Sequence, residues 1–416
     1  MTATATTTTT TTASYYRLNV SLLPDSLYRS DIPVEKWISD DPDDCKKNKP
    51  WMSLSFSPNG FPSGSLGKVV DTLPWDVEIE RCIGISLWMI FNVLPFGVPF
   101  LLVLWKGIGL IIAKYVLLLV TLYVVVLSSI EYLYFYPRFS KQYPQTITKD
   151  NVRSNQYIWT ERNTTKYLST SYVWPSELQT LDKKQPVIYC LIPHALAPFG
   201  VVAYPVWSKL WNGILTSWTA APIIFQLPLI SYFMTRVGYI PAKAGPILKT
   251  LQQQNQKQEQ QRRNVGIILD GIEGMFATHS HTEEVACILK RKGIVKIALK
   301  AGVSIVPVYG FGHSDMYTVW VDPFGILKFL SSTLGVSLTP FFGRWGWFLG
   351  PPKRNVAVTV CLGKPIPMPQ IDDPNQADID KYHEQLLQGF TNVFDSHKVA
   401  YYGESVGSKK KLIFAN

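Results

Sequence analysis

An almost uncharged stretch constrains this chain more than any other feature. Between Arg81 and Glu131 the sequence runs for 49 residues with only two charged side chains. As a helix it would reach ~73 Å, roughly twice the ~30 Å hydrocarbon core of a bilayer. We therefore predict a membrane hairpin over residues 82–130, made of two apolar segments, 82–105 and 108–130. Helix pairs in the core of a soluble protein rarely run this long without polar residues.

Basic residues flank this predicted hairpin on both sides. Lys68 and Arg81 precede it, and Arg138 and Lys141 follow it. Because positive charge favours the cytosolic side of a membrane, both ends of the hairpin are expected to face the cytosol. Lys114 lies inside the second segment, where a charge is costly. Whether the hairpin spans the bilayer or forms a shallow wedge is therefore left open.

The remaining sequence divides into two parts. Residues 1–80 are expected to be a disordered or irregular cytosolic region, with disorder over the threonine-rich residues 1–30, which lack the features of a signal peptide. Residues 131–416 are long enough for one large α/β domain. The five cysteines are isolated in the sequence, as expected for reduced thiols in a cytosol-facing protein.

The chain has 40 Lys and Arg against 30 Asp and Glu, a formal charge of +10. A basic surface beside a membrane hairpin favours anionic headgroups or an anionic soluble substrate as partners. Nucleic acid is not expected, because the sequence contains no basic and aromatic recognition element.

Apolar runs of strand type alternate with helical stretches after the hairpin. This alternation predicts an α/β fold, a sheet with helices on its faces. The expected strands are 187–192, 214–219, 265–269, 303–309 and 356–362. The expected helices are 201–210, 229–237, 245–263 and 294–299.

Polar residues follow three of these strands, at 193–195, 270–274 and 310–315. Catalytic groups in α/β sheets sit in the loops past the carboxyl ends of strands, and neighbouring ends can form one pocket. His194 is the strongest candidate, because a histidine at a strand end suits a general base at neutral pH. The alternative is a histidine hydrogen-bonded for structure.

Two other kinds of site fit the sequence less well. The chain contains no Gly-x-Ser-x-Gly elbow, which argues against a serine acyl-enzyme. His279, His281, Glu283 and Glu284 have no spacing typical of a metal site, so a solvated loop is the better interpretation and no metal is predicted.

Several long motifs follow one another in the second half of the chain, at 291–299, 302–312, 340–346, 363–367 and 378–383, and Phe135-Tyr136-Pro137 lies just past the hairpin. In these motifs the chain from Tyr132 onward resembles the type-2 diacylglycerol acyltransferase family, which includes monoacylglycerol and wax-alcohol acyltransferases. The resemblance implies a glycerolipid-acyltransferase-like α/β sheet anchored by the N-terminal membrane hairpin.

The chain departs from the family pattern at four places. The His-Pro-His-Gly motif reads Ile192-Pro193-His194-Ala195, Asp270 replaces the first glycine of a Gly-Gly pair, the glutamate of that block appears as Glu273 with Gly274 in its place, and His313 replaces the glutamate after Phe-Gly. These changes bear on the rate and on the choice of acceptor rather than on the fold.

The family resemblance implies transfer of a fatty acyl group from acyl-CoA, as substrate, to an acylglycerol hydroxyl, with no metal or redox cofactor. His194 would act as the general base, and Glu273, or else Asp315, would orient its ring. Amides around Gly271 would stabilise the oxyanion or simply form the turn. A histidine at 313 would make that position sensitive to pH between ~5 and 8.

Basic residues are the candidates for binding acyl-CoA. Lys290, Arg291 and Lys292 precede a predicted helix and suit the phosphates of coenzyme A, although a solvated helix face explains them equally well. Arg344 lies in an aromatic-rich loop, where it could contact a lipid headgroup or acyl-CoA.

Three functions remain open on these grounds. The first is synthesis of triacylglycerol from diacylglycerol, and the second is the same chemistry on monoacylglycerol or a long-chain alcohol. The third is a catalytically silent protein of a membrane or lipid droplet. The expected location is the endoplasmic reticulum membrane, with lipid droplets as an alternative, and a homo-oligomer is left open.

Overall fold

A computed structural model describes residues 14–20, 54–69, 81–83, 85–86, 163–181, 185–201, 214, 216–226, 234, 238–252, 263–277, 282–320, 322–335 and 337–416. Within these residues nine strands form one sheet, in the order β2-β1-β3-β12-β9-β4-β7-β5-β6. The strands are β1 (Tyr15–Asn19), β2 (Leu54–Ser57), β3 (Ser171–Pro175), β4 (Ile188–Ile192), β5 (Thr216–Ala220), β6 (Ile240–Pro241), β7 (Asn264–Ile268), β9 (Ile305–Phe311) and β12 (Thr359–Leu362).

The sheet is parallel from β9 through β4, β7 and β5 to β6. Beyond β9, β12 runs antiparallel to β9 and parallel to β3, and β1 runs antiparallel to both β3 and β2. The predicted strands correspond to β4, β5, β7, β9 and β12, with bounds that differ by at most three residues. The expected α/β class is confirmed, with this mixed sheet at its centre.

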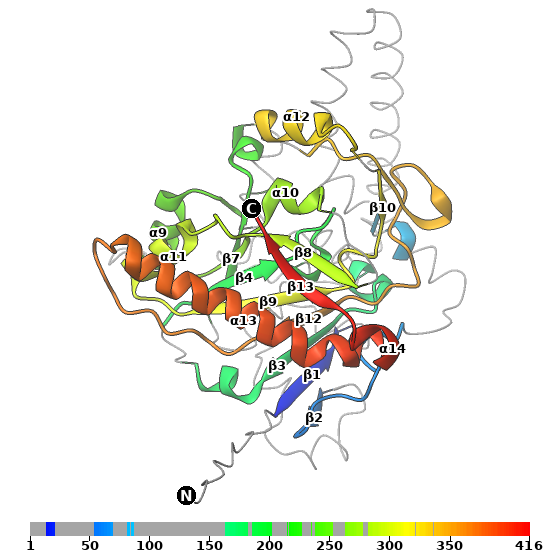
Figure 1. The fold of residues 1–416 in the computed structure, drawn as a ribbon, viewed down its shortest axis with the longest axis horizontal. Coiled ribbons are helices and arrows are strands. Elements are labelled where there is room, and N and C mark those ends of the chain that lie inside the picture. Colours follow the sequence, from blue (N-terminus) through cyan, green and yellow to red (C-terminus); the bar gives the residue numbers. More distant parts are fainter. Residues whose placement is uncertain are drawn as a thin grey trace, which may run out of the picture.

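Both faces of the sheet are buried. In β4, Tyr189 and Leu191 point to one hydrophobic core, and Ile188, Cys190 and Ile192 point to the other. The second core also contains apolar residues of three helices, α9 (Ala244–Gln252), α11 (Gly293–Ala301) and α13 (Gln376–Tyr402). These helices lie together over one face of the sheet (Figure 1). A strand buried on both faces explains the continuous apolar runs in the sequence.

The long helix α13 has clear end signals. Its N-cap Asn375 accepts a hydrogen bond from the Asp378 amide at 2.9 Å, and the helix ends at Gly403, whose φ is +82°. Its inner face carries Phe394, which stacks on Phe311 of β9 with ring centroids 5.7 Å apart. The helix therefore packs against one face of β9. The residues that follow the C-terminal end of β9 contribute to the site described below.

Shorter elements complete the domain. They are the helices α10 (Gly271–Met275), α12 (Ile326–Leu334) and α14 (Glu404–Gly407), the parallel pair β8 (Glu283–Cys287) with β13 (Lys411–Ala415), and the antiparallel pair β10 (Thr318–Val319) with β11 (Phe341–Phe342). The predicted helix 294–299 is α11, and helix 245–263 begins as α9. The rest of the latter, and most of the predicted helices 201–210 and 229–237, lie outside the described residues.

The expectation of an irregular N-terminal region is wrong for β1 and β2. Strand β1 pairs on one side with β2 and on the other with β3, so it is an interior strand of the sheet. Leu18 is buried, and the ring of Tyr16 stacks on that of Trp174 at 5.9 Å. In this segment only Tyr15 and Tyr16 favour a strand, and its partner β3 lies far along the chain, so the sequence contains little local signal for it.

The predicted membrane hairpin lies outside the described residues except for 82–83 and 85–86. None of the helices in the described part of the chain has the length and apolar character needed to cross a bilayer. Ile85 is fully buried in the first hydrophobic core, and the Cys82 sulfur accepts a hydrogen bond from Arg344 Nη1 at 3.7 Å. These first residues of the predicted segment therefore pack against the α/β domain.

Removing β1 should destabilise the folded domain. A truncation of residues 1–20 exposes the edge of β3 and the core around Leu18, and loss of one fully buried leucine alone costs about 2 kcal/mol. We expect the thermal midpoint to fall by several degrees relative to a control truncation of residues 1–13, which keeps β1. Equal midpoints for the two truncations would show that β1 contributes nothing to the fold.

Candidate active site at the ends of three parallel strands

Three loops meet at one edge of the sheet. Strand β4 lies between β7 and β9 and is parallel to both, so the residues after each strand leave the sheet at the same end. The pairing is close to that end, because Leu191 pairs with Ile268 and Ile192 with Tyr309. The predicted convergence of the loops after these strands is confirmed.

His194 follows β4 and is half-buried. Its Nδ1 lies 2.9 Å from the carbonyl oxygen of Ala195. Because a carbonyl oxygen only accepts hydrogen bonds, this contact requires the proton on Nδ1. In the neutral ring Nε2 then carries the lone pair, which is the arrangement that a general base needs.

The backbone of His194 is held by Asp270. The His194 amide donates to both carboxylate oxygens of Asp270, at 2.8 and 2.9 Å. Asp270 follows β7 and is completely buried. Both carboxylate oxygens bind this one amide, so the contact fixes the position at which the His194 side chain leaves the chain.

His313 follows β9 and is also buried. Its Nε2 accepts a hydrogen bond from the Gly200 amide at 2.9 Å, and its Nδ1 donates to the carbonyl oxygen of Pro193 at 3.3 Å. Side chains at Gly200 or Gly310 would collide with the ring. His313 therefore joins the two ends of the loop 193–200 that carries His194.

Burial keeps the His313 ring neutral. Desolvation lowers the pKa of His313 from its ordinary value near 6.5 to about 4, although the bond to the Pro193 carbonyl opposes the shift; nearby His194 lowers the pKa further. The expectation that position 313 responds to pH between ~5 and 8 is therefore wrong. It assumed a partly solvated ring, whereas this ring is enclosed by the loop that it holds.

The two carboxylates expected to orient the His194 ring lie elsewhere. Glu273 pairs with Arg291, with Oε2 at 3.1 Å from Nη2, and both side chains are more than a third exposed. Asp315 is exposed. Desolvation is the main cause of the raised pKa values of Tyr401 and Tyr402, and the charge of Asp315 raises them further. Asp270, which sequence reasoning treated only as a replaced glycine, is the carboxylate in contact with His194. The sequence signal that could have identified Asp270 is its position directly after a buried strand.

A model of the family described as "Diacylglycerol acyltransferase" matches residues 114–415 of this chain. The chain belongs to the diacylglycerol acyltransferase family. The chain is thus one of a family of acyltransferases, as the motifs in its second half had indicated.

The names of three mammalian relatives specify different acyl acceptors. The chain is 27% identical over 242 residues to "Diacylglycerol O-acyltransferase 2-like protein 6" of Bos taurus, which covers 53% of this chain and 68% of the relative. It is 30% identical over 237 residues to "2-acylglycerol O-acyltransferase 1" of Mus musculus, covering 54% and 68%. A 120-residue stretch is 34% identical to "Acyl-CoA wax alcohol acyltransferase 2" of Homo sapiens, covering 27% and 35%.

Among solved structures, the chain has a loose likeness to the 1-acyl-sn-glycerophosphate acyltransferase PlsC from Thermotoga maritima. The TM-score is 0.34 and the identity 14%, over 67% of this chain and 95% of that chain.

Two residues in the loops after β4 and β7 have positive φ angles. Ala195 stands at the glycine of the family motif and keeps a positive φ of +47°, a conformation that costs an alanine roughly 1–2 kcal/mol. Gly271 has φ +50° in the turn after β7, where a glycine avoids that cost. The turn role expected for Gly271 is confirmed, whereas an oxyanion role stays a prediction.

The loop after β9 is braced by a buried ion pair. Glu284 of β8 pairs with Lys410, and both side chains are almost completely buried. The same carboxylate accepts hydrogen bonds from Ser314, next to His313, at 3.1 Å and from Tyr402 at 3.0 Å. Glu284 thus has a structural role in place of the metal ligation considered for it.

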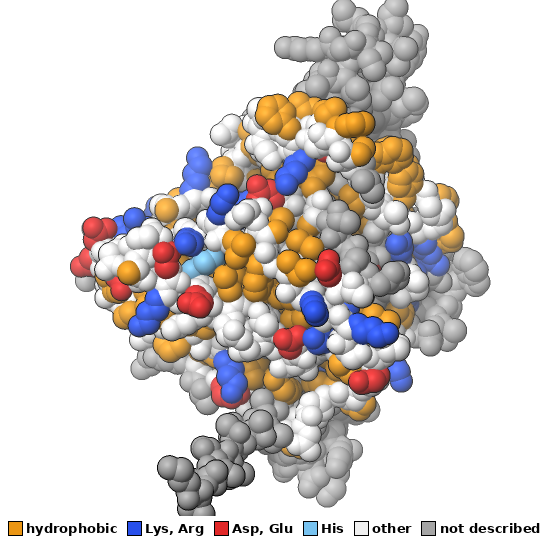
Figure 2. All heavy atoms as spheres, viewed as in Figure 1, with side chains coloured by type: hydrophobic (Ala, Val, Ile, Leu, Met, Phe, Trp, Pro, Cys, Tyr) orange, Lys and Arg blue, Asp and Glu red, His pale blue; other side chains and the backbone are white. Residues whose placement is uncertain are grey.

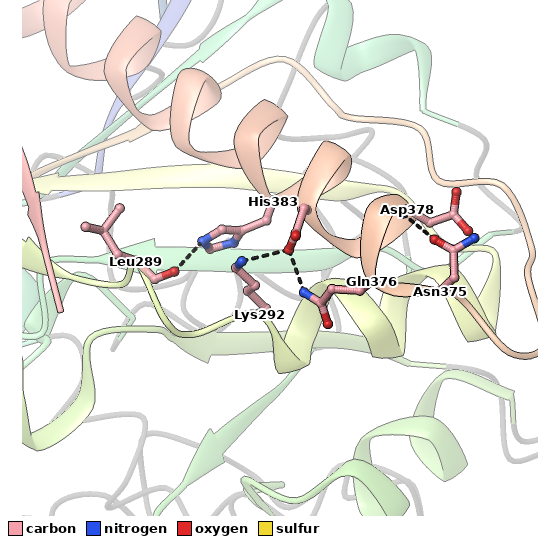
Figure 3. A network of polar contacts seen from close by, with 7 residues as sticks. Leu289, Lys292, Asn375, Gln376, Asp378 and His383 are labelled. Carbon is pink, nitrogen blue, oxygen red and sulfur yellow. Dashed lines mark hydrogen bonds and ion pairs between the residues drawn. The ribbon is translucent and has the colours of Figure 1, made fainter.

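The residues predicted to bind acyl-CoA have different surroundings in the structure. Lys292 precedes α11 and pairs with Asp380 of α13 at 2.7 Å, in a polar network between the two helices (Figure 3). Arg291 is exposed and lies beside the site, because it pairs with Glu273 and a side chain on Gly271 would come within 3.7 Å of it. Lys290 is exposed. Arg344 contacts Cys82 and lies 4.2 Å from the ring centre of Trp345.

The buried His313 should make the fold sensitive to acid. Since its folded pKa is below the unfolded value, the unfolded chain binds more protons between pH 6.5 and about 4. The contribution of the neutral His313 ring to the free energy of unfolding is therefore fully present above pH 6.5, and it decreases as the pH falls through this window. We expect His313→Gln, whose amide can still accept from Gly200, to reduce the fall in thermal midpoint between pH 7 and pH 4.5.

His397 is a suitable comparison, because burial also lowers its pKa to about 4 and it lies on α13. His397→Gln should remove a separate part of the acid sensitivity, and the two effects should add. A midpoint that depends on pH equally in the wild type and in His313→Gln would show that His313 is not buried as a neutral ring.

Proposed function

We propose that this chain transfers a fatty acyl group from acyl-CoA to the free hydroxyl of diacylglycerol and so makes triacylglycerol. The observation that carries the proposal is the arrangement of His194. Its Nδ1 proton is directed to the Ala195 carbonyl, so Nε2 is the basic nitrogen at the shared end of three strands. Membership of the diacylglycerol acyltransferase family supports the reaction class.

In the proposed reaction His194 Nε2 takes the proton of the acceptor hydroxyl as the oxygen attacks the thioester carbonyl carbon. A tetrahedral oxyanion forms, and the carbon–sulfur bond then breaks. The departing thiolate of coenzyme A receives the proton back from the imidazolium. The ester and free coenzyme A leave, and the histidine returns to its starting form. The chemistry uses acyl-CoA as a substrate and needs no metal or redox cofactor.

Other residues have supporting roles in this proposal. Amides near Gly271 would stabilise the oxyanion. Arg291 and Lys290, both exposed, would bind coenzyme A phosphates, whereas Lys292 already has Asp380 as a partner. Glu273 would act through Arg291 rather than on the imidazole, since those two side chains are paired.

The roles of Asp315 and Arg344 are less direct. Asp315 is exposed just after His313 and stays a candidate for acceptor contact. Arg344 would bind a headgroup or acyl-CoA from its place beside Trp345.

The water-insoluble acceptor calls for a membrane location. We propose the endoplasmic reticulum membrane, with the hairpin at 82–130 as anchor and both ends in the cytosol, and the lipid-droplet surface as a second location. The apolar stretch and its basic flanks support this placement.

A second candidate keeps the chemistry and changes the acceptor. The relatives named for 2-acylglycerol and wax alcohol match this chain at 30% and 34% identity, and relatives named for diacylglycerol match at 27% and 32%. Monoacylglycerol or a long-chain alcohol would then replace diacylglycerol as the source of the attacking hydroxyl.

Expression in cells that lack neutral-lipid synthesis distinguishes these functions. Triacylglycerol accumulation would support the first candidate. Accumulation of wax esters, or of diacylglycerol alone, would support the second. A well-expressed, membrane-bound protein that makes no neutral lipid would contradict both and leave a catalytically silent scaffold.

His194→Ala should abolish most of the acyl transfer in the same cells. Removal of a general base costs a factor of ~10²–10⁴ in rate. The thermal midpoint should stay close to that of the wild type, because the Asp270 carboxylate binds the backbone of residue 194 and not its ring. If the rate of His194→Ala per folded protein is within about threefold of the wild-type rate, His194 is not the general base.

A further inference from the structure

The helix α12 leaves large apolar side chains exposed, unlike a usual surface helix. Its buried residue is Ser331, whose hydroxyl oxygen accepts the Leu338 amide at 2.8 Å. Ile326 and Phe329 are instead 58% and 69% exposed. A surface helix normally turns its apolar side to the core, so this orientation indicates a partner outside the domain.

A second exposed apolar group lies on the neighbouring loop. Trp345, Trp347 and Phe348 are each about 60% exposed. The antiparallel pair β10–β11 joins this loop to the segment that leads into α12. Hydrophobic side chains gather over α12 and along the adjoining edge (Figure 2). We refer to the exposed apolar side chains of 320–334 and 345–349 as the apolar face.

The charge around the apolar face is basic. Residues 320–354 contain Lys328, Arg344, Lys353 and Arg354 and a single acid, Asp322. The Asp322 carboxylate accepts a hydrogen bond from the Lys328 backbone amide at 2.9 Å, in the first turn of α12. Tryptophan with nearby Arg and Lys is typical of segments that lie at a membrane interface, and the basic side chains favour anionic headgroups.

We propose that the apolar face rests on a lipid surface with anionic headgroups and that it directs the active site towards that surface. The helix α12 packs on α10, which begins at Gly271 directly after Asp270. Contact of α12 with lipid therefore brings the His194 loop close to the layer that holds an insoluble acceptor. The directing role rests on the proposed function, whereas the lipid contact does not.

The contact can be measured with the full chain in vesicles that carry bromine on their acyl chains. A fluorophore is attached to Phe329→Cys or Trp347→Cys, with Lys381→Cys on the exposed side of α13 as control. We expect bromine to quench the first two several-fold more than the control. Equal quenching at the three positions, or quenching at none of them, would overturn the proposal.

Charge and activity provide two further measurements. Lys328→Glu with Lys353→Glu should reduce the quenching in phosphatidylcholine vesicles that contain phosphatidylserine, and change it little without phosphatidylserine. Trp347→Ser with Phe348→Ser should raise the KM for an acceptor in vesicles and leave the rate with a detergent-dispersed acceptor unchanged. Quenching without any acyl transfer would contradict the proposed function and leave the lipid contact intact. Crosslinking of Phe329→Cys to a protein in place of quenching would overturn the lipid proposal.

A different observation carries a second inference, at Asp270. A side chain on Gly274 would collide with the Asp270 carboxylate, because residues 270 and 274 lie one helical turn apart. In the motif that this chain resembles, a glycine is expected at 270 and an acid at 274. The carboxylate and the glycine have thus exchanged positions in this chain, and the space that they occupy is shared.

We infer that Asp270 is the positioning residue for His194 and replaces the acid that the pattern places at 274. Asp270→Gly should lower kcat by about 10²-fold, since small misplacements of a catalytic group are that costly. The KM for acyl-CoA should change little, because Asp270 is buried. Gly274→Glu alone should also fail, since its side chain meets Asp270.

The double variant Asp270→Gly with Gly274→Glu tests the exchange. We expect it to regain a large part of the lost kcat, with a thermal midpoint above that of Gly274→Glu. A double variant that folds as well as Asp270→Gly and is no more active would overturn the positioning role. His194→Ala in the double-variant background should again abolish transfer, which separates this inference from the proposed base.

Discussion

The parallel pairing of β4 with β7 and β9 is the constraint on which the site depends. Three strands that run in one direction must release their following residues at one edge, and the register places the ends of β7 and β9 within two residues of the end of β4. Residues that are 76 and 120 positions apart, such as His194 with Asp270 and Pro193 with His313, become direct partners. Burial of both sheet faces keeps this pairing rigid, because neither face can shift without disturbing a packed core.

The loop that carries His194 is held by two groups of opposite character. Asp270 is an acceptor-only carboxylate that binds one backbone amide with both oxygens. His313 is a neutral ring that donates to one carbonyl and accepts from one amide. Together they satisfy backbone groups that would otherwise be unpaired in a buried loop. Neither holds the His194 ring itself, which leaves Nε2 available for proton transfer.

The strands and the convergence of the three loops could be predicted from the sequence, because long buried strands have continuous apolar runs. His194 could be placed at a strand end for the same reason. The role of Asp270 could not, since nothing local shows that a carboxylate binds an amide 76 residues away. The burial of His313 could not be predicted either, because it depends on two glycines, Gly200 and Gly310, from different segments. Strand β1 was missed because its partner β3 lies far along the chain.

The position of β1 also has a consequence for the order in which the chain folds. Tyr15 pairs with Pro175, and β3 in turn pairs with β12, which begins at Thr359. During synthesis β1 can pair early with β2, but its other edge stays open until β3 has left the ribosome, and this half of the sheet closes only after β12 follows. Contacts between such distant segments slow folding and leave strand edges open for longer. Chaperone binding to the nascent N-terminal segment would protect it during that interval.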